Sequence, residues 1–182
     1  MCTHKGTAIG LAAAVLLAAC TTPSMEPQPS PQGLNLGRAV TADEIKAWDI
    51  GIPPSGAGLP PGSGSVQQGA VVYVAKCQAC HGTNGAGKPV DALVGGQGTL
   101  ASDNPLRTVG SYWPYATTLF DYVRRAMPTN APKSLTDSEV YAVSAYVLQL
   151  NGIISQDAVM NAQTLPQVKM PNRDGFIDYS GK

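Results

Sequence analysis

The chain has 182 residues, of which 13% are charged and 6% aromatic, and its 12 Lys+Arg residues balance its 12 Asp+Glu residues. The length suits one domain with extensions, and the 20 glycines and 15 prolines predict much irregular structure. The sequence has neither a basic excess nor a run of like charges. No nucleic-acid partner is therefore expected.

The first segment, residues 1–19, has the features of an export signal. Lys5 precedes an apolar run from Ile9 to Ala19, which is shorter than the ~20 residues of a membrane-spanning helix. The run ends in Leu-Ala-Ala before Cys20, which resembles a bacterial lipoprotein cleavage box. We predict lipidation of Cys20 and a periplasmic protein anchored to the membrane through lipid. An ordinary signal peptide with a free secreted product is the alternative.

Residues 20–65 are predicted to be a tether and an N-terminal extension. Prolines recur through residues 21–33, which favours a semi-rigid, extended tether. Thr41 and Glu44 have the spacing of a capping box, so a short helix is expected after Thr41. Five glycines and four prolines in residues 51–65 predict a linker or a long loop.

A helical domain is predicted over residues 66–152. Apolar residues recur at helical spacing in 66–77, 114–126 and 136–150, and no convincing strand pattern is present. The predicted fold class is all-α, and a domain this small would gain stability from a bulky apolar group at its centre. Residues 153–182 are expected to form an irregular C-terminal extension.

The ends and faces of these helices can also be predicted. Ser65 is placed to cap the first helix, and Thr136 with Glu139 has the capping-box spacing at the start of the last. The apolar stripe expected on the middle helix consists of Leu119, Tyr122, Val123 and Ala126.

The pentad Cys77-Gln-Ala-Cys80-His81 has the pattern of covalent haem attachment. Its two thiols add to the haem vinyl groups, and the histidine binds the iron as proximal ligand. A thioredoxin-like motif would follow a strand, and none is predicted here. A closed zinc site needs four ligands, more than these residues supply. We therefore predict one covalent haem c, held by Cys77, Cys80 and His81.

The other axial ligand of the iron is predicted to be a methionine. His4 lies in the signal segment, so His81 is the only histidine of the mature chain and bis-histidine ligation is excluded. Methionine, lysine, water or an open position remain. Met127 and Met170 both precede proline, and Met127 ends a predicted helix, so Met127 is favoured. Core packing is the alternative for either, and His/Met ligation would suit electron transfer.

These features resemble a class I cytochrome c domain over residues 66–152. The resemblance rests on the pentad with its following glycine, the Met-Pro at Met127 and the final helix. It implies that the first and last helices cross, with Gly69 facing Tyr146.

Further residues are candidates for contact with the haem. Arg107 can pair with a propionate, and Tyr112 and Trp113 can donate hydrogen bonds while their rings pack on the macrocycle. The carbonyl of Pro89 is a candidate acceptor for the His81 ring N–H. For each residue, an ordinary surface or core role is the alternative.

Several longer stretches are similar to the cytochrome subunits of bacterial sulfite and sulfane dehydrogenases. They are residues 44–50, 58–66, 109–128 and 165–176. In that family a molybdenum-containing subunit oxidises the sulfur compound, and the cytochrome takes the electrons singly. Residues 48–56 depart from the more charged form that this family usually shows.

The expected function is single-electron transfer by a monohaem c-type cytochrome that performs no substrate chemistry itself. The resemblance implies a molybdenum dehydrogenase subunit as donor and a downstream cytochrome or oxidase as acceptor. Two alternatives stay open. One is a haem enzyme with an open sixth site, such as a peroxidase or a thiosulfate-oxidising cytochrome, and the other is a general periplasmic electron carrier. The two extensions are expected either to wrap the cytochrome's own core or to contact the partner.

Overall fold

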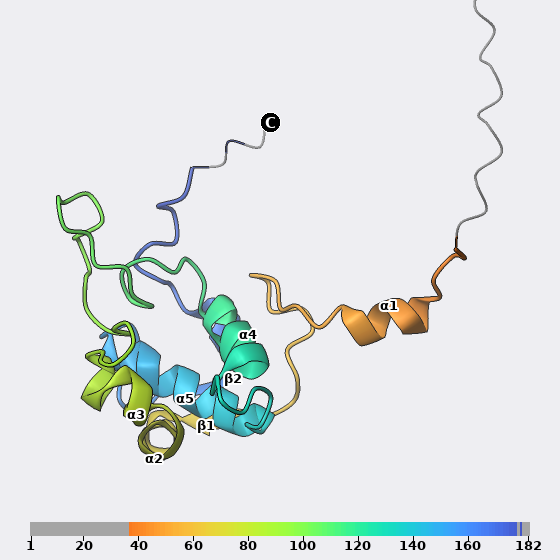
Figure 1. Ribbon diagram of the computed structural model, residues 1–182, viewed down its shortest axis with the longest axis horizontal. Coiled ribbons are helices and arrows are strands. Elements are labelled where there is room, and N and C mark those ends of the chain that lie inside the picture. The colour runs from red at the N-terminus through yellow and green to blue at the C-terminus, as the bar shows by residue number, and fades with distance from the viewer. Residues whose placement is uncertain (1–36, 178, 180–182) are drawn as a thin grey trace, which may run out of the picture. The chain divides into compact units, whose positions relative to one another are not determined.

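The computed structural model describes residues 37–177 and 179 (Figure 1). The predicted signal segment, residues 1–19, and Cys20 lie outside the described residues. The chain divides into two compact units, Met1–Glu44 and Ile45–Lys182. Among the described residues, no helix combines the length and apolar character needed to cross a membrane.

Helix α1, Ala42–Trp48, begins with the predicted capping box. The Glu44 N–H donates to Thr41 Oγ1 at 3.3 Å, and the Thr41 N–H donates to the Glu44 carboxylate at 2.9 Å. The Arg38 guanidinium also pairs with this carboxylate. Arg38, and after it Thr41, lowers the pKa of Glu44 to about 2. The carboxylate therefore stays charged at neutral pH and keeps these bonds.

The second unit contains the three predicted helices of the haem domain and several shorter elements. They are α2 (Val66–Lys76), α3 (Gln78–His81), η1 (Thr83–Gly85), α4 (Ala116–Ala126), α5 (Asp137–Leu150) and η2 (Leu165–Gln167). Helix α4 begins at Ala116 rather than at residue 114. The mostly helical fold predicted from the sequence is confirmed.

The predicted caps of α2 and α5 are both formed. Ser65 Oγ accepts the Gln68 N–H at 3.2 Å, and the side-chain oxygen of Gln68 accepts the Ser65 N–H at 2.9 Å. Thr136 and Glu139 form the same reciprocal pair at the start of α5. Each box satisfies two backbone N–H groups that a helix start otherwise leaves without partners.

Helices α2 and α5 cross in close contact, and Figure 1 shows α2 nearly end-on where α5 runs across the view. A Cβ placed on Gly69 would lie 2.6 Å from the Ala142 carbonyl carbon and 2.8 Å from Tyr146 Cβ. The rings of Tyr73 and Tyr146 lie next to this crossing, with centroids 5.3 Å apart. The expectation that Gly69 faces Tyr146 is therefore confirmed.

A short antiparallel sheet joins the two flanks of the helical domain. Its strands are β1 (Ser63–Ser65) and β2 (Val159–Asn161), with Gly64 opposite Met160. The prediction that the chain holds no strand is wrong. Three-residue strands are too short to show an alternating pattern in the sequence. Packing requires a glycine at position 64, because a Cβ there would lie 2.5 Å from Ala142 Cβ.

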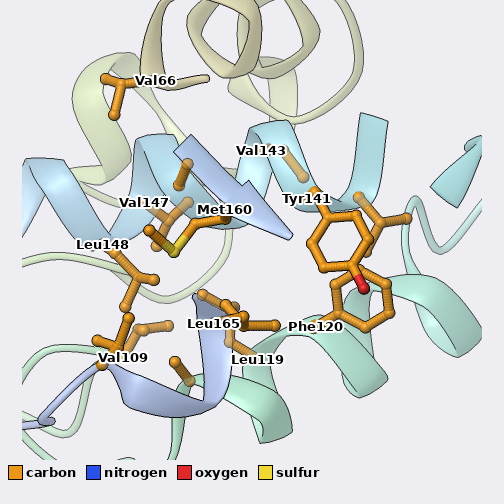
Figure 2. Close-up of a cluster of buried hydrophobic side chains, with 14 of the residues drawn as sticks. Val66, Val109, Leu119, Phe120, Tyr141, Val143, Val147, Leu148, Met160 and Leu165 are labelled. Atoms are coloured by element: carbon orange, nitrogen blue, oxygen red, sulfur yellow. The ribbon is translucent and has the colours of Figure 1, made fainter. Parts of the chain in front are cut away.

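The apolar core lies between α5, α4 and the segments that follow α5 (Figure 2). The rings of Phe120 and Tyr141 pack with their centroids 4.4 Å apart, and both side chains are fully buried. The predicted stripe of α4 is wrong at one position, because Tyr122 is 47% exposed and Phe120 is buried in its place. Tyr122 instead packs edge-on against Trp113, and helical spacing alone does not distinguish the two faces.

The segment after α5 completes this core. Leu165, Val168 and Met170 are buried in the same cluster as the helices. On the other flank, Ile52 is buried and the Tyr141 hydroxyl donates to the Pro60 carbonyl at 2.9 Å. Parts of both extensions thus wrap the chain's own core, which is one of the two arrangements expected from the sequence.

Candidate haem-binding site

One helical turn carries the three pentad residues predicted to hold haem, which are Cys77, Cys80 and His81. The Cys77 N–H still bonds the Tyr73 carbonyl of α2 at 2.9 Å, and the backbone bends there into α3. The Cys80 and His81 N–H groups then both donate to the Cys77 carbonyl, at 3.1 and 3.0 Å. Both thiols are free, with Cys77 half-buried and Cys80 exposed. The two thiols and the imidazole are thus presented together, without a disulfide between them.

The acidity of the Cys77 thiol argues against a redox dithiol. Burial, and after it the neighbouring Cys80, raises the pKa of the Cys77 thiol to about 11. Thioredoxin-type motifs work the opposite way and lower the pKa of the attacking thiol. No strand leads directly into Cys77, because helix α2 does.

The backbone around His81 is held by bonds from several segments. The Gly87 N–H donates to the His81 carbonyl at 2.8 Å, and the Val90 N–H donates to the Cys80 carbonyl at 3.2 Å. The buried Tyr73 hydroxyl donates to the Gly82 carbonyl at 2.9 Å. The pentad is therefore fixed by its following loop and by α2 together.

The imidazole of His81 is oriented by a backbone carbonyl. Its Nδ1 lies 3.3 Å from the Asp91 carbonyl oxygen. With Nδ1–H as the donor, Nε2 is left free to bind a metal. The prediction of Pro89 as the acceptor is wrong. The chain turns here, because the Lys88 N–H donates to the Val90 carbonyl at 2.6 Å. The carbonyl that reaches His81 is therefore that of Asp91, two residues after Pro89.

Met127 lies at the C-terminal end of α4, where its N–H bonds the Val123 carbonyl at 3.1 Å. Its side chain is half-buried, and the Thr129 hydroxyl donates to its sulfur at 3.4 Å. Met160 and Met170 are buried in the apolar core. Among the methionines that the structure describes, Met127 alone has a sulfur outside that core. Its role as axial ligand stays a prediction.

Two of the three predicted haem contacts in residues 107–113 pack against each other, and the third packs against helix α4. Arg107 is exposed and its guanidinium lies 5.5 Å from the centre of the Tyr112 ring. Trp113 is half-buried and packs edge-on against Tyr122, with ring centroids 5.7 Å apart. The structure therefore places Arg107 with Tyr112 and Trp113 with α4. Their contacts to haem stay predictions.

The tail after α5 supports this same segment. Asn172 Nδ2 donates to the Tyr112 carbonyl at 2.7 Å, and the Phe176 ring packs edge-on against the Tyr112 ring at 5.2 Å between centroids. The Arg173 guanidinium lies 4.5 Å from the Tyr115 ring centre. The C-terminal extension thus reaches residues that the sequence predicts to line the haem.

One residue that holds the site together, Asn151, was not predicted from the sequence. This residue is 9% exposed and its side-chain amide donates to the Leu93 carbonyl at 3.1 Å. Its side-chain oxygen accepts the Gly95 N–H at 3.2 Å. No local sequence signal distinguishes such an asparagine from an ordinary helix end, because its partners lie more than 50 residues away.

The donor set of the site fits haem c. Two free thiols three positions apart, an oriented imidazole and a half-buried thioether are the groups that this cofactor requires. Cys77, Leu93, Trp113 and Val123 are each partly buried and packed against the apolar core. In residues 37–177 and 179, no group of three or more His, Cys, Asp or Glu side chains could hold a metal ion.

Comparisons with known proteins agree with this chemistry. A family model described as cytochrome c oxidase, cbb3-type, subunit III matches residues 64–147. A chain of the crystal structure of the sulfane dehydrogenase SoxCD from Paracoccus pantotrophus matches with 40% sequence identity and a TM-score of 0.74. This match covers 81% of the present chain and 73% of that chain. No curated protein matches the chain.

Proposed function

The chain belongs to the c-type cytochromes, in the family described as cbb3-type oxidase subunit III, and on this premise we propose that it is the electron-accepting subunit of a sulfur-compound dehydrogenase. A molybdenum-containing subunit oxidises the sulfur compound. This cytochrome takes the electrons one at a time and passes them to a downstream cytochrome or oxidase. It carries out no chemistry on the sulfur compound itself.

Each site residue has a separate task in this proposal. Cys77 and Cys80 would hold one haem covalently, with His81 and Met127 as its axial ligands. When bound, haem c supplies a one-electron iron couple whose potential His/Met ligation raises. The Asp91 carbonyl keeps the His81 imidazole in one orientation. Leu93, Trp113 and Val123 would exclude water from the ring, and Arg107 with Tyr112, which lie in contact, would bind a propionate.

The observation that carries the proposal is the similarity to the SoxCD chain along most of both chains. That similarity extends well beyond the residues that the cytochrome family model matches. A general cytochrome c would be expected to share the haem domain alone. The shared extensions favour a common partner, and for SoxCD the named activity is sulfane dehydrogenase.

The partner can be tested by reconstitution. The purified cytochrome is mixed with a purified molybdenum-containing subunit of a sulfur-compound dehydrogenase, a sulfur compound is added, and the haem absorbance is followed. We expect reduction of the haem only when both the molybdenum subunit and the sulfur compound are present. A cytochrome that forms no complex with that subunit, and is reduced equally well by unrelated donors, would instead be a general electron carrier.

A second measurement separates a carrier from a haem enzyme. A six-coordinate His/Met haem leaves no position for peroxide or substrate. The reduced wild-type protein is therefore expected to bind carbon monoxide poorly and to show negligible peroxidase turnover. Rapid, stoichiometric binding of carbon monoxide would instead support an enzyme with an open sixth site.

The proposal places the protein in the periplasm, anchored by lipid at Cys20. It is supported by the basic start, the short apolar run and the small residues that precede Cys20. Cys20→Ser is expected to release the protein from the membrane fraction or to block removal of the signal. A wild-type protein that is already soluble, and that starts at another residue, would contradict the anchor.

A further inference from the structure

We infer that Asn151 is a positioning residue for the haem site, which holds both the His81 loop and the 108–113 segment against the end of α5. The inference rests on the proposed role of His81 as a haem ligand. Asn151 itself would touch neither the iron nor the ring. It would act through the backbone segments that do.

The first set of contacts fixes the loop that follows the pentad. The Asn151 side chain donates to the Leu93 carbonyl at 3.1 Å and accepts the Gly95 N–H at 3.2 Å. The Gln97 side chain donates to the Asn151 carbonyl at 3.0 Å. Residues 86–107 contain no helix or strand. These three bonds therefore replace the regular backbone ladder that would otherwise hold such a loop in place.

The loop that Asn151 holds is the one that orients the proximal ligand. The Asp91 carbonyl lies 3.3 Å from His81 Nδ1, two residues before Leu93. The Leu93 N–H also donates back to the Gly85 carbonyl at 2.8 Å, just after the pentad. Leu93 is therefore bonded on one side to the pentad loop and on the other to Asn151. Displacing it would move the Asp91 carbonyl relative to the imidazole.

The second set of contacts reaches the opposite segment. The buried Thr108 hydroxyl donates to the Gly95 carbonyl at 2.6 Å, so Asn151 and Thr108 hold Gly95 from its two backbone groups. Gly110 packs directly on Asn151, since a Cβ at position 110 would lie 2.9 Å from Asn151 Cβ. Val109, which lies between Thr108 and Gly110 in the sequence, belongs to the buried cluster with Leu148 of α5 (Figure 2). This turn leads straight into Tyr112 and Trp113.

A simple helix-capping role does not need this arrangement. An asparagine that only ends a helix satisfies local backbone groups, and Asn151 does so once, through its bond to Val147 at 2.9 Å. Its other hydrogen-bond partners, Leu93, Gly95 and Gln97, all lie in one distant segment, and Gly110 of a second segment packs on it. A buried amide with satisfied hydrogen bonds favours one arrangement of the segments around it.

The test compares Asn151→Ala with Asn161→Ala in the holoprotein. Asn161 is the matched control, because its side-chain oxygen accepts the Gln163 and Thr164 N–H groups at 2.8 and 2.9 Å, near β2. The readouts are the midpoint of urea unfolding, the haem reduction potential and the paramagnetically shifted NMR signals of the haem methyls and the His81 ring. Both variants are expected to unfold at lower urea concentration. Asn151→Ala alone is expected to move the haem methyl and His81 signals.

The sign of the potential shift can also be predicted. A weaker bond from His81 Nδ1–H makes the imidazole a poorer electron donor, and this favours the reduced iron. Asn151→Ala is therefore expected to shift the potential upward, and Asn161→Ala to leave it unchanged. Asn151→Asp has nearly the same shape and loses the donor to Leu93, so it should also shift the haem methyl and His81 signals if Asn151→Ala does not fold.

The inference is overturned if Asn151→Ala, or Asn151→Asp in its place, loses stability while the potential and the shifted signals match the wild type. It is also overturned if Asn161→Ala moves those signals as much. A wild-type protein without a covalent haem spectrum would refute the proposed function, and this inference with it. The first two outcomes leave the proposed function intact.

Discussion

The loops that follow His81 and Met127 are both irregular, but they are held in different ways. After His81, backbone bonds from Gly87, Val90 and Leu93 and the Tyr73 hydroxyl tie the loop to the pentad and to α2. After Met127, the hydrogen bonds are local. Among the described residues, none joins residues 128–134 to another element.

This difference indicates where each ligand obtains its position. The imidazole of His81, the proposed proximal ligand, lies against the Asp91 carbonyl. The backbone on either side is bonded to the Tyr73 hydroxyl at Gly82 and to the Asn151 side chain at Leu93. The thioether of Met127 has only the bond from Thr129 and the end of α4 to place it. We therefore expect substitutions on the proximal side to change folding and haem binding, and substitutions on the distal side to change ligation with little loss of stability.

The largest effect is expected from Gly69→Val, which blocks the helix crossing behind the pentad. The new side chain would collide with the Ala142 backbone and Tyr146 Cβ, and neither is the flexible end of a side chain. Overpacking costs about 1–3 kcal/mol even where side chains can yield. We expect no folded holoprotein by absorbance or circular dichroism. Gly51→Ala is the control, because no atom lies within 4 Å of a Cβ there, and it should behave as wild type.

The next comparison is between two methionines that both precede proline. Met170→Ala removes a fully buried side chain and should cost about 2–5 kcal/mol in the free energy of unfolding. It should leave the weak near-infrared sulfur-to-iron band intact. Met127→Ala should remove that band and allow carbon monoxide to bind, with a smaller loss of stability. Loss of the band in Met170→Ala alone would show that the distal ligand is misassigned.

A smaller effect is expected from Tyr73→Phe, which removes one hydroxyl on the proximal side. The Gly82 carbonyl loses its donor, which should cost about 1–2 kcal/mol in urea unfolding. Tyr146→Phe removes an exposed bond to Asn84 and should cost less, about 0.5 kcal/mol. Equal losses in the two variants would contradict the tighter hold assigned to Tyr73.

The same pair also makes a prediction about pH. Burial, more than the neighbouring Cys77, raises the pKa of Tyr73 to about 12 from 10.0. The folded protein therefore binds this proton more tightly, and stability is lost as pH rises from about 10 towards 12. Tyr73→Phe should show less of this alkaline loss.

The smallest effect is expected from Thr129→Val, which removes the donor to the Met127 sulfur without changing side-chain size. A sulfur that donates no density to a hydrogen bond binds oxidised iron more strongly, so the haem potential should fall slightly. The free energy of unfolding measured in urea should stay within about 0.5 kcal/mol of the wild-type value, as for most substitutions of exposed residues. Thr129→Ser keeps the donor and should restore the wild-type potential. A shift in Thr129→Ser equal to that in Thr129→Val would contradict the bond.

Local signals account for most of what the sequence predicted correctly. The boxes at Ser65 and Thr136 act within one helical turn, and so does the pentad from Cys77 to His81. Gly69 opposite Tyr146 came from the resemblance to a family rather than from spacing. In each case a short stretch contains all or nearly all of the chemistry that decides the structure.

Distant segments decided two of the errors, and a local turn decided the third. Phe120 is buried rather than Tyr122 because Tyr141 packs against it from α5. Asp91 rather than Pro89 reaches His81 because the chain turns between residues 88 and 90. The bonds of Asn151 span more than 50 residues, and no window of sequence contains both partners.

The late segment that buries Leu165, Val168 and Met170 has a consequence for how the chain is made. Synthesis runs from the N-terminus, so the thiols of Cys77 and Cys80 leave the ribosome well before Met170 does. Until then the cluster around α5 lacks three of its buried members, and the native core cannot close. The nascent chain therefore passes through a period in which the thiols of Cys77 and Cys80 are already present and the apolar core is still open.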